Sequence, residues 1–162
     1  MDKQQKRIVL VVALLLVAMV VAIIVVAALK KNSVGDFVPP PLEANAVAGV
    51  PDPLPEAFGT LTVNPEFVVG VCACPSLEGT NLGVYLTAHE SNTCYVKIQI
   101  FDEDMNLLGE SGLLKPGEYL ATVPLFVPTE TKTLRATILA YEPETYYSLG
   151  SANINLAIAS GK

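Results

Sequence analysis

The chain has no tryptophan, a single histidine (His89) and only three cysteines among its 162 residues. It also lacks a Gly-x-Ser-x-Gly elbow, a phosphate-binding loop and a glycine-rich dinucleotide turn. Acids are numerous, but no motif places two of them together as a catalytic pair. These absences predict neither a catalytic centre nor a bound cofactor, and we expect a non-enzymatic protein.

Basic residues are scarce beyond the first 31 positions. Residues 32–162 hold five basic side chains against fifteen acidic ones, a net charge of −10. A surface this acidic repels phosphate backbones and anionic lipid headgroups, which argues against nucleic-acid binding and against docking on an anionic membrane surface. The charge leaves another protein as the expected partner.

Polar residues are absent from one long stretch. Residues 8–29 are 22 consecutive Ala, Val, Ile, Leu or Met residues. As a helix they would extend about 33 Å, close to the ~30 Å of a bilayer's hydrocarbon core. We predict an uncleaved transmembrane anchor. The alternative is a cleavable signal peptide, although the apolar core of such peptides usually has about 7–15 residues.

The flanking charges predict the orientation of this anchor. Three basic residues precede the apolar run and two follow it, namely Lys3, Lys6, Arg7, Lys30 and Lys31. This asymmetry favours residues 1–7 as a cytoplasmic tail in a single-pass plasma-membrane protein, with the C-terminal domain extracytoplasmic. Ala18 and Ala22 form a small-xxx-small pair that would let two helices pack closely, so a homodimer is one arrangement open to the chain.

Proline is concentrated between the apolar run and the rest of the chain. Residues 30–57 contain six of the twelve prolines, and the run at positions 39–41 favours an extended backbone. We interpret 30–57 as a stalk that separates a domain from the membrane. A ligand for a proline-recognition module is the alternative, but no flanking basic residue supports a specific class.

The remaining residues, 58–162, alternate apolar and polar side chains with turn signals between the runs. This pattern predicts about seven short strands, at 61–63, 67–71, 84–88, 94–100, 119–125, 134–140 and 152–158. Such a series favours an all-β immunoglobulin-like sandwich. The missing tryptophan would make it a divergent one, and a small jelly roll or partial barrel is the alternative.

The three cysteines are Cys72, Cys74 and Cys94. Outside the cell we expect a disulfide, in which Cys94 pairs with Cys72 or with Cys74. The closed loop of about 20 residues corresponds to roughly 3 kcal/mol in the chain-entropy model. The remaining cysteine would be a thiol or would bridge two copies of the chain.

Two chemical alternatives use the same residues. Cys72, Cys74, His89 and Cys94 form a set that zinc accepts, although Cys-x-Cys is tighter than the usual Cys-x-x-Cys knuckle. Cys94 with His89 also matches a thiol nucleophile and its base. Against the second, an extracytoplasmic thiol tends to oxidise.

Two loops carry further candidate sites. Asp102–Asn106 begins like a calcium loop, but Leu107 and Leu113 stand where a glycine and a bidentate glutamate are needed, so we predict a polar hairpin with at most loose cation binding. The loop 142–150 carries Tyr146 and Tyr147, which form a candidate contact patch for a partner. The alternative has one ring packed under the loop and the other exposed.

The stretch 95–125, YVKIQIFDEDMNLLGESGLLKPGEYLATVPL, and the later ATILAYEPET resemble a group of small single-pass membrane proteins of Gram-positive bacteria. Those proteins pair an N-terminal anchor with an outer immunoglobulin-like sandwich, and several are associated with mobile or conjugative elements. The resemblance covers about 70 residues, rests on a structural Leu-x-Pro-Gly turn, and implies an accessory role at the cell surface. It assigns no functional residue.

These observations predict a membrane-anchored module for protein–protein interaction or envelope assembly. One alternative is a subunit of a surface filament or of a secretion or conjugation apparatus, although the apolar run lacks a processing site followed by glutamate. The other alternative is a metal- or thiol-dependent enzyme that uses the cysteine and histidine set.

Overall fold

The structure, a computed structural model, describes residues 2, 5, 12, 15–21, 37–63 and 67–159. The chain divides into two units, Met1–Pro39 and Pro40–Lys162. Residues 15–21 of the first unit are helical, and most of the predicted span 8–29 lies outside the described residues. Among the residues that are described, no helix combines the length and apolar character needed to cross a membrane.

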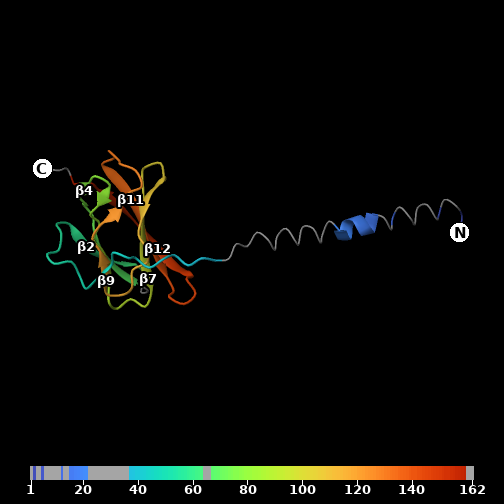
Figure 1. Ribbon diagram of the computed structural model, residues 1–162, viewed down its shortest axis with the longest axis horizontal. Helices are drawn as coiled ribbons and strands as arrows, with labels where there is room; N and C mark the ends of the chain where they lie inside the picture. The colour runs from blue at the N-terminus through green and yellow to red at the C-terminus, as the bar shows by residue number, and fades with distance from the viewer. Residues whose placement is uncertain are drawn as a thin grey trace. The chain divides into compact units, whose positions relative to one another are not determined.

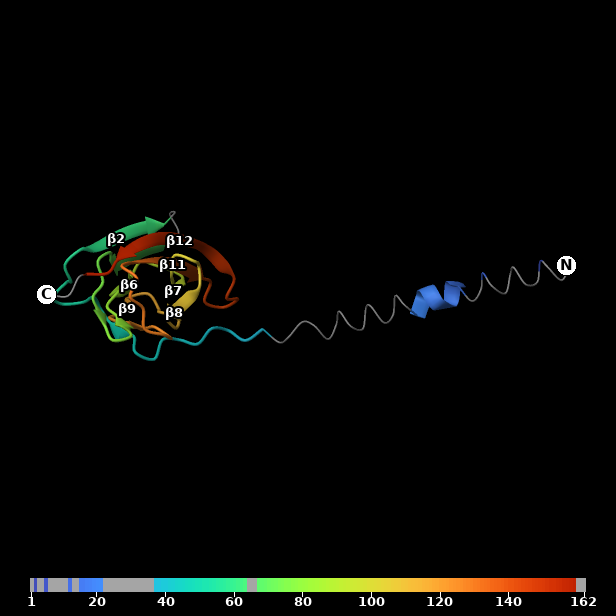
Figure 2. The ribbon, with the colours of Figure 1, turned by 90° about the horizontal axis from the view of Figure 1, so that it is seen from above.

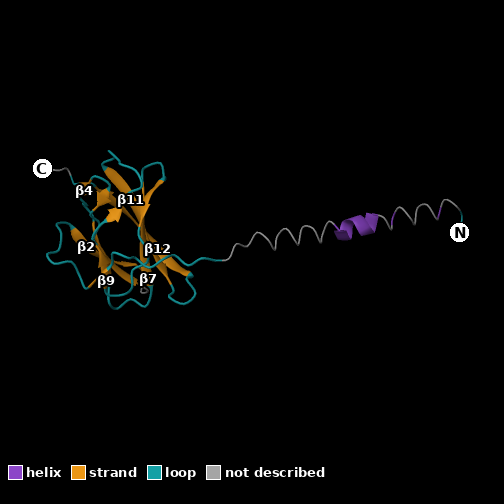
Figure 3. Ribbon diagram, viewed as in Figure 1, coloured by secondary structure: helices purple, strands orange, loops and turns teal. Residues whose placement is uncertain are grey.

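The second unit is built of strands, drawn in orange in Figure 3. They are β1 (Val47–Ala48), β2 (Phe58–Val63), β3 (Phe67–Cys72), β4 (Leu77–Glu78), β5 (Asn81–Leu82), β6 (Leu86–Ala88), β7 (Tyr95–Phe101), β8 (Leu107–Glu110), β9 (Glu118–Leu120), β10 (Val123–Pro124), β11 (Thr133–Tyr141) and β12 (Ser148–Ala157).

Antiparallel pairing arranges these strands in three sheets (Figure 1). The orders are β1-β9-β6-β3-β2, β10-β5-β4 and β12-β11-β7-β8. Inward-facing side chains of all three sheets form one apolar core, to which Val69, Leu82 and Ile98 belong. This mostly antiparallel β architecture around one core is consistent with a β-sandwich.

The alternation that predicts the strands is visible in their burial. On β11, the even-numbered residues from Leu134 to Ala140 are buried and the odd-numbered ones are not. The long central strands β7 and β11 pair in register, with Ile98 opposite Ile138, so their apolar side chains lie on the same face. Figure 2 shows β7, β11 and β12 in this sheet from above.

Five of the seven predicted strands correspond directly to β2, β3, β7, β11 and β12, and 84–88 contains the shorter β6. The predicted strand 119–125 is wrong as a single element. It divides into β9, which pairs with β6 and β1, and β10, which pairs with β5, because the chain changes sheets between them. The short strands β1, β4, β5 and β8 were not predicted.

The predicted stalk and the compact unit overlap. The unit begins at Pro40, well before the predicted domain boundary at residue 58. The Leu113 N–H donates to the Pro41 carbonyl and the Glu43 N–H to the Leu113 carbonyl, while Val47 pairs with Tyr119. Residues 41–48 are therefore part of the β domain, since their backbone groups bond to it.

Candidate functional site

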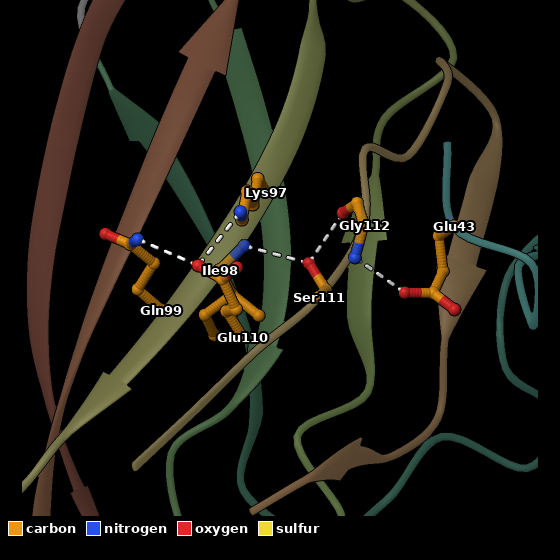
Figure 4. A network of polar contacts seen from close by, with 7 residues as sticks. All are labelled: Glu43, Lys97, Ile98, Gln99, Glu110, Ser111 and Gly112. Carbon is orange, nitrogen blue, oxygen red and sulfur yellow. Dashed lines mark hydrogen bonds and ion pairs between the residues drawn. The ribbon is translucent and has the colours of Figure 1, made fainter. Parts of the chain in front are cut away.

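The outer face of the four-stranded sheet carries a buried cation. On β7 the residues Val96 and Ile98 enter the core, so Lys97 and Gln99 project from the opposite face. Lys97 is only 8% exposed, and its ammonium lies 2.9 Å from the Glu110 carboxylate of β8. The Gln99 amide donates to the same carboxylate oxygen at 3.0 Å (Figure 4). These contacts connect β7 to β8 through side chains as well as backbone.

The charge state of this pair follows from its surroundings. Burial raises the pKa of Glu110, but the hydrogen bonds from Gln99 and Lys97 and the charge of Lys97 oppose it, and the net effect is a pKa below the ordinary glutamate value. Glu110 is therefore a carboxylate at neutral pH. The ammonium is compensated, as a buried charge requires.

A chain of hydrogen bonds continues from this pair to the start of the domain. The Ile98 N–H donates to the Ser111 hydroxyl, which in turn donates to the Gly112 carbonyl. The Gly112 N–H donates to the Glu43 carboxylate at 2.7 Å (Figure 4). A Cβ atom at Gly112 would lie 2.7 Å from the Glu43 backbone, so only glycine allows this approach.

The free side of β8 is closed by the residues after β10. The Phe126 N–H donates to the Leu108 carbonyl, and Gly109 and Leu125 form a β-bridge. One edge of the four-stranded sheet is thus satisfied by backbone contacts. On the outer face beside this edge, the Lys97–Glu110 ion pair joins β7 to β8.

The opposite edge of the same sheet is strand β12. It has β11 as its one neighbour among the described strands. The sequence of Ser148–Ala157, SLGSANINLA, contains no charged residue and no proline. Natural sheets usually protect such an edge with lysine, proline, a bulge or a covering segment. Its length and neutrality make this edge the candidate interaction site of the domain.

Two hydrogen bonds show which backbone groups of β12 face outward. The Ile158 N–H points to β11 and donates to the Lys132 carbonyl, whereas the Ala157 N–H points away and donates to the Ala73 carbonyl. Because these directions alternate along a strand, the N–H and C=O groups of Ser151, Asn153 and Asn155 also point away from β11. We call these three residues the β12 edge.

The β12 edge is bounded at both ends. Toward the C-terminus, the Ala157 and Ala159 N–H groups donate to the carbonyls of Ala73 and Pro75. Toward the N-terminus, the pairing with β11 shifts register between Ala140 and Tyr141, opposite Gly150 and Ser148. A partner strand would therefore have a short and defined stretch to pair with.

Shallow hollows lie on the described surface of the domain, and two of them bear on the candidate residues. One of about 200 Å³ lies beside Asn155 and is lined also by Asp102, Glu103 and Arg135. The other, of about 310 Å³, is lined by His89, Glu90, Val50 and Gly117. The first adjoins one end of the β12 edge.

The three cysteines, all within the described residues, form no disulfide. Cys94 is buried in the core, whereas Cys74 is exposed. Phe67 and Val69 face the core, so alternation places Cys72 on the other face of β3, where its thiol donates to the Glu56 carbonyl. Burial raises the pKa of the Cys72 thiol, although the Cys74 N–H opposes the shift. The predicted disulfide stays a prediction.

The zinc set considered as an alternative is not assembled. Cys72, Cys74, His89 and Cys94 all lie in the described part of the chain, where no three His, Cys, Asp or Glu side chains are placed to hold a metal ion. His89 lies in an exposed turn, and its Nδ1 is 2.7 Å from the Ser91 hydroxyl. The Cys94–His89 pairing fails for the same geometric reason: one residue is in the core and the other is in solvent.

The two predicted loops have different outcomes. The polar hairpin after β7 is confirmed: the Asp102 carboxylate accepts hydrogen bonds from the backbone and side-chain amides of Asn106, which lower the pKa of Asp102. In the tyrosine loop, Tyr147 is 73% exposed and Tyr146 is half-buried. The loop thus offers one exposed ring, which matches the alternative stated for it more closely than a two-ring patch.

Sequence reasoning missed the residues that organise this sheet. Lys97 and Glu110 were not singled out, although a lysine between valine and isoleucine in an alternating strand is a signal that could have been noticed. Asn153 and Asn155 alternate with apolar residues in the sequence, but their position on an open edge depends on strand order. Comparison with protein-family models, with curated proteins and with solved structures finds no match to this chain.

Proposed function

We propose that this chain is a membrane-anchored, extracytoplasmic interaction module with a divergent immunoglobulin-like sandwich, and that it binds a protein by strand addition at the β12 edge. The observation that carries the proposal is the open, uncharged edge itself. An extended segment supplies a row of C=O and N–H groups that can hydrogen-bond to the outward N–H and C=O groups of the edge. No other class of partner supplies such groups in a row. The module is non-enzymatic.

The location at the cell envelope rests on the sequence. The apolar run 8–29 has the length of a membrane span, and the residues after it carry the acidic charge suited to an exported domain. The resemblance of residues 95–125 to single-pass proteins of Gram-positive bacteria supports the same placement. The strongly acidic domain disfavours nucleic acid as the partner.

Site-specific photocrosslinking tests this proposal. A photoreactive residue replaces Asn155 in the full chain, in the membrane of the cells that produce it. A matched control carries the same residue at Glu90, which is also exposed but lies between β6 and β7. We expect a discrete protein adduct from position 155 and none from position 90.

A second variant identifies strand addition as the mode of binding. Asn153→Pro removes an outward N–H that β11 does not use, so the fold tolerates it as it would on any sheet edge. The adduct at position 155 should fall at least fivefold in this background. An absence of adducts at 155, or adducts unaffected by Asn153→Pro, would overturn the proposed function.

A further inference from the structure

Two thiols lie in one short turn at the end of β3, on Cys72 and Cys74. Even along an ordinary extended strand, the Cα atoms of residues two apart are separated by only about 6.6–6.8 Å. A disulfide needs a Cα separation of roughly 4.4–6.8 Å. The chain bends at Ala73 and Cys74 and is not fully extended there. The backbone therefore places the two cysteines within the range for a disulfide.

Backbone hydrogen bonds hold this turn in place. The Cys72 N–H donates to the Val84 carbonyl at 2.8 Å, and the Ala73 N–H donates to the Ala57 carbonyl at 3.1 Å. On its other side, the Ala73 carbonyl accepts a hydrogen bond from the Ala157 N–H at 3.0 Å. The residue between the two cysteines is thus fixed at both of its polar groups, and the thiols on either side of it are held near each other.

The two thiols differ in their access to solvent. Cys72 is 2% exposed and its thiol donates to the Glu56 carbonyl at 3.2 Å, whereas Cys74 is exposed. Burial is the main reason why the pKa of the Cys72 thiol is raised; negative charge on Cys74 raises it further, and the Cys74 N–H opposes the shift. Both effects of Cys74 require it to lie close to the Cys72 sulfur. The pair consists of one accessible and one sheltered thiol that interact directly.

Cys94 is separated from this pair by the fold. It lies in the core just before β7, which belongs to the four-stranded sheet. Cys72 lies on β3 of the five-stranded sheet, on the face opposite the core-facing Val69. A bond between Cys72 and Cys94 would require β3 to turn over, which would take Val69 out of the core. Cys74 is therefore the partner that Cys72 reaches with the smallest rearrangement.

We propose that Cys72 and Cys74 form a redox site, at which a disulfide compound oxidises the two thiols to a Cys72–Cys74 disulfide while Cys94 keeps its thiol. This inference goes beyond the proposed function and does not depend on strand addition at the β12 edge. The co-substrate is a small or exposed disulfide, since it must meet Cys74 at the surface. Such disulfides are the usual oxidants of thiols in the extracytoplasmic compartment expected for this domain.

The oxidation consists of two exchange steps. The Cys74 thiolate attacks one sulfur of the oxidant, whose S–S bond breaks; one thiolate leaves and a mixed disulfide remains on Cys74. The Cys72 thiol then loses its proton to solvent and attacks the Cys74 sulfur, which releases the second thiolate. The two released thiolates take up the two protons that the cysteines lost. Two electrons pass to the oxidant, so two protein thiols and one disulfide become one protein disulfide and two thiols.

The order of the steps follows from burial. The oxidant meets Cys74 first because Cys72 is sheltered. Once the mixed disulfide has formed, Cys72 is already beside it and attacks at a high effective concentration. The mixed disulfide should therefore be short-lived in the wild-type chain and should persist when Cys72 is replaced.

Peptide mapping of the full chain tests this assignment. The reduced chain is treated in detergent with oxidised glutathione, its remaining thiols are alkylated in denaturant, and the chain is cleaved after glutamate. Cleavage separates residues 67–78, which hold Cys72 and Cys74, from residues 91–103, which hold Cys94. We expect peptide 67–78 to be two hydrogens lighter and not alkylated, and peptide 91–103 to be alkylated.

Single variants identify the role of each thiol. In Cys72→Ser, glutathione should remain on Cys74, and the mixed disulfide should be about tenfold more abundant than in the wild-type chain. In Cys74→Ser, Cys72 should stay unmodified because it is buried. Cys94→Ser is the matched control and should yield the same light peptide 67–78. The wild-type peptide map does not depend on the folding of any variant.

Several results would overturn the redox site. A link between peptides 67–78 and 91–103 would assign the disulfide to Cys94. Two linked copies of peptide 67–78 would show that the exposed thiol bridges two chains. Glutathione that remains on wild-type Cys74, or no reaction at all, would show that the two thiols do not join. None of these results bears on strand addition, which photocrosslinking from position 155 tests separately.

Discussion

Strands β8 and β12 are the two edges of one four-stranded sheet, and they differ in almost every respect. β8 is short, is bonded by Leu125 and Phe126, and presents Glu110 to the buried Lys97. β12 is the longest strand of the domain, is uncharged, and has one neighbour among the described strands. The same sheet thus has one closed and one open edge.

The difference has a physical meaning. A buried ammonium that needs its carboxylate fixes one strand against another, because separating the two would leave an uncompensated charge. An open, neutral edge carries no such constraint and keeps its hydrogen-bonding groups available to another chain. We infer that the closed edge maintains the fold and that the open edge serves recognition.

The largest effect is expected at the closed edge. In Gly112→Ala the new Cβ atom would lie 2.7 Å from the Glu43 backbone, which must then move away. We expect a loss of about 2–3 kcal/mol in the free energy of unfolding, measured by denaturant titration. Gly59→Ala is the matched control: nothing lies within 4 Å of its Cβ position, and its effect should stay within about 0.5 kcal/mol. Equal effects of the two substitutions would show that the approach of Glu43 is not required.

A smaller loss is expected from the ion pair. Glu110→Gln leaves the Lys97 ammonium with a neutral amide, and we expect a cost of about 1–2 kcal/mol, below the value for a fully buried pair because Glu110 is partly exposed. The double variant Lys97→Met with Glu110→Met should recover most of that loss. If the double variant is instead less stable than Glu110→Gln, the ion pair contributes favourable interaction energy to folding beyond the compensation of the buried Lys97 charge.

The pH dependence of stability tests the same pair with a smaller signal. The pKa of Glu110 in the folded chain lies below its ordinary value of 4.5. Its contribution is therefore complete above about that pH and is lost as the pH falls through the folded pKa. The difference in unfolding free energy between wild type and Glu110→Gln should shrink between pH 6 and pH 3. A difference that stays constant would show that the pKa of Glu110 is the same in the folded and unfolded chain.

The smallest effect on stability is expected at the open edge. Asn153→Lys places a charge on an exposed residue whose N–H is not used by β11, and it removes the exposed hydrogen bond from Thr137. Thermal unfolding of the monomer should change by no more than about 0.5 kcal/mol. A larger loss would mean that the β12 edge contributes to the fold itself, and the contrast with β8 would disappear.

Much of this fold was predictable from alternation alone. β3, β7, β11 and β12 each bury one face. The alternation of apolar and polar residues identifies such strands even when the neighbouring strands are unknown. Strands of two residues, such as β1 and β4, are too short to show a period. The boundary at Pro40 could not be predicted either, because residues 41–43 are bonded to Gly112 and Leu113, which lie far along the chain.

The candidate site was less predictable than the fold. The cysteines and His89 were candidate ligands because of their chemistry. The fold separates them, since Cys94 lies in the core and Cys74 and His89 lie in solvent. An edge is a property of strand order, and the sequence of β12 resembles that of any strand with one buried face. Its openness follows only once β11 is known to be its neighbour.

Amide hydrogen exchange along β12 tests the central claim most directly. In the dilute full chain, the amides of Ser151, Asn153 and Asn155 should exchange at least a hundredfold faster than those of Ala152, Ile154 and Leu156, which bond to β11. Uniform protection along β12 in the dilute chain would contradict the account, because it would mean that the edge is already covered.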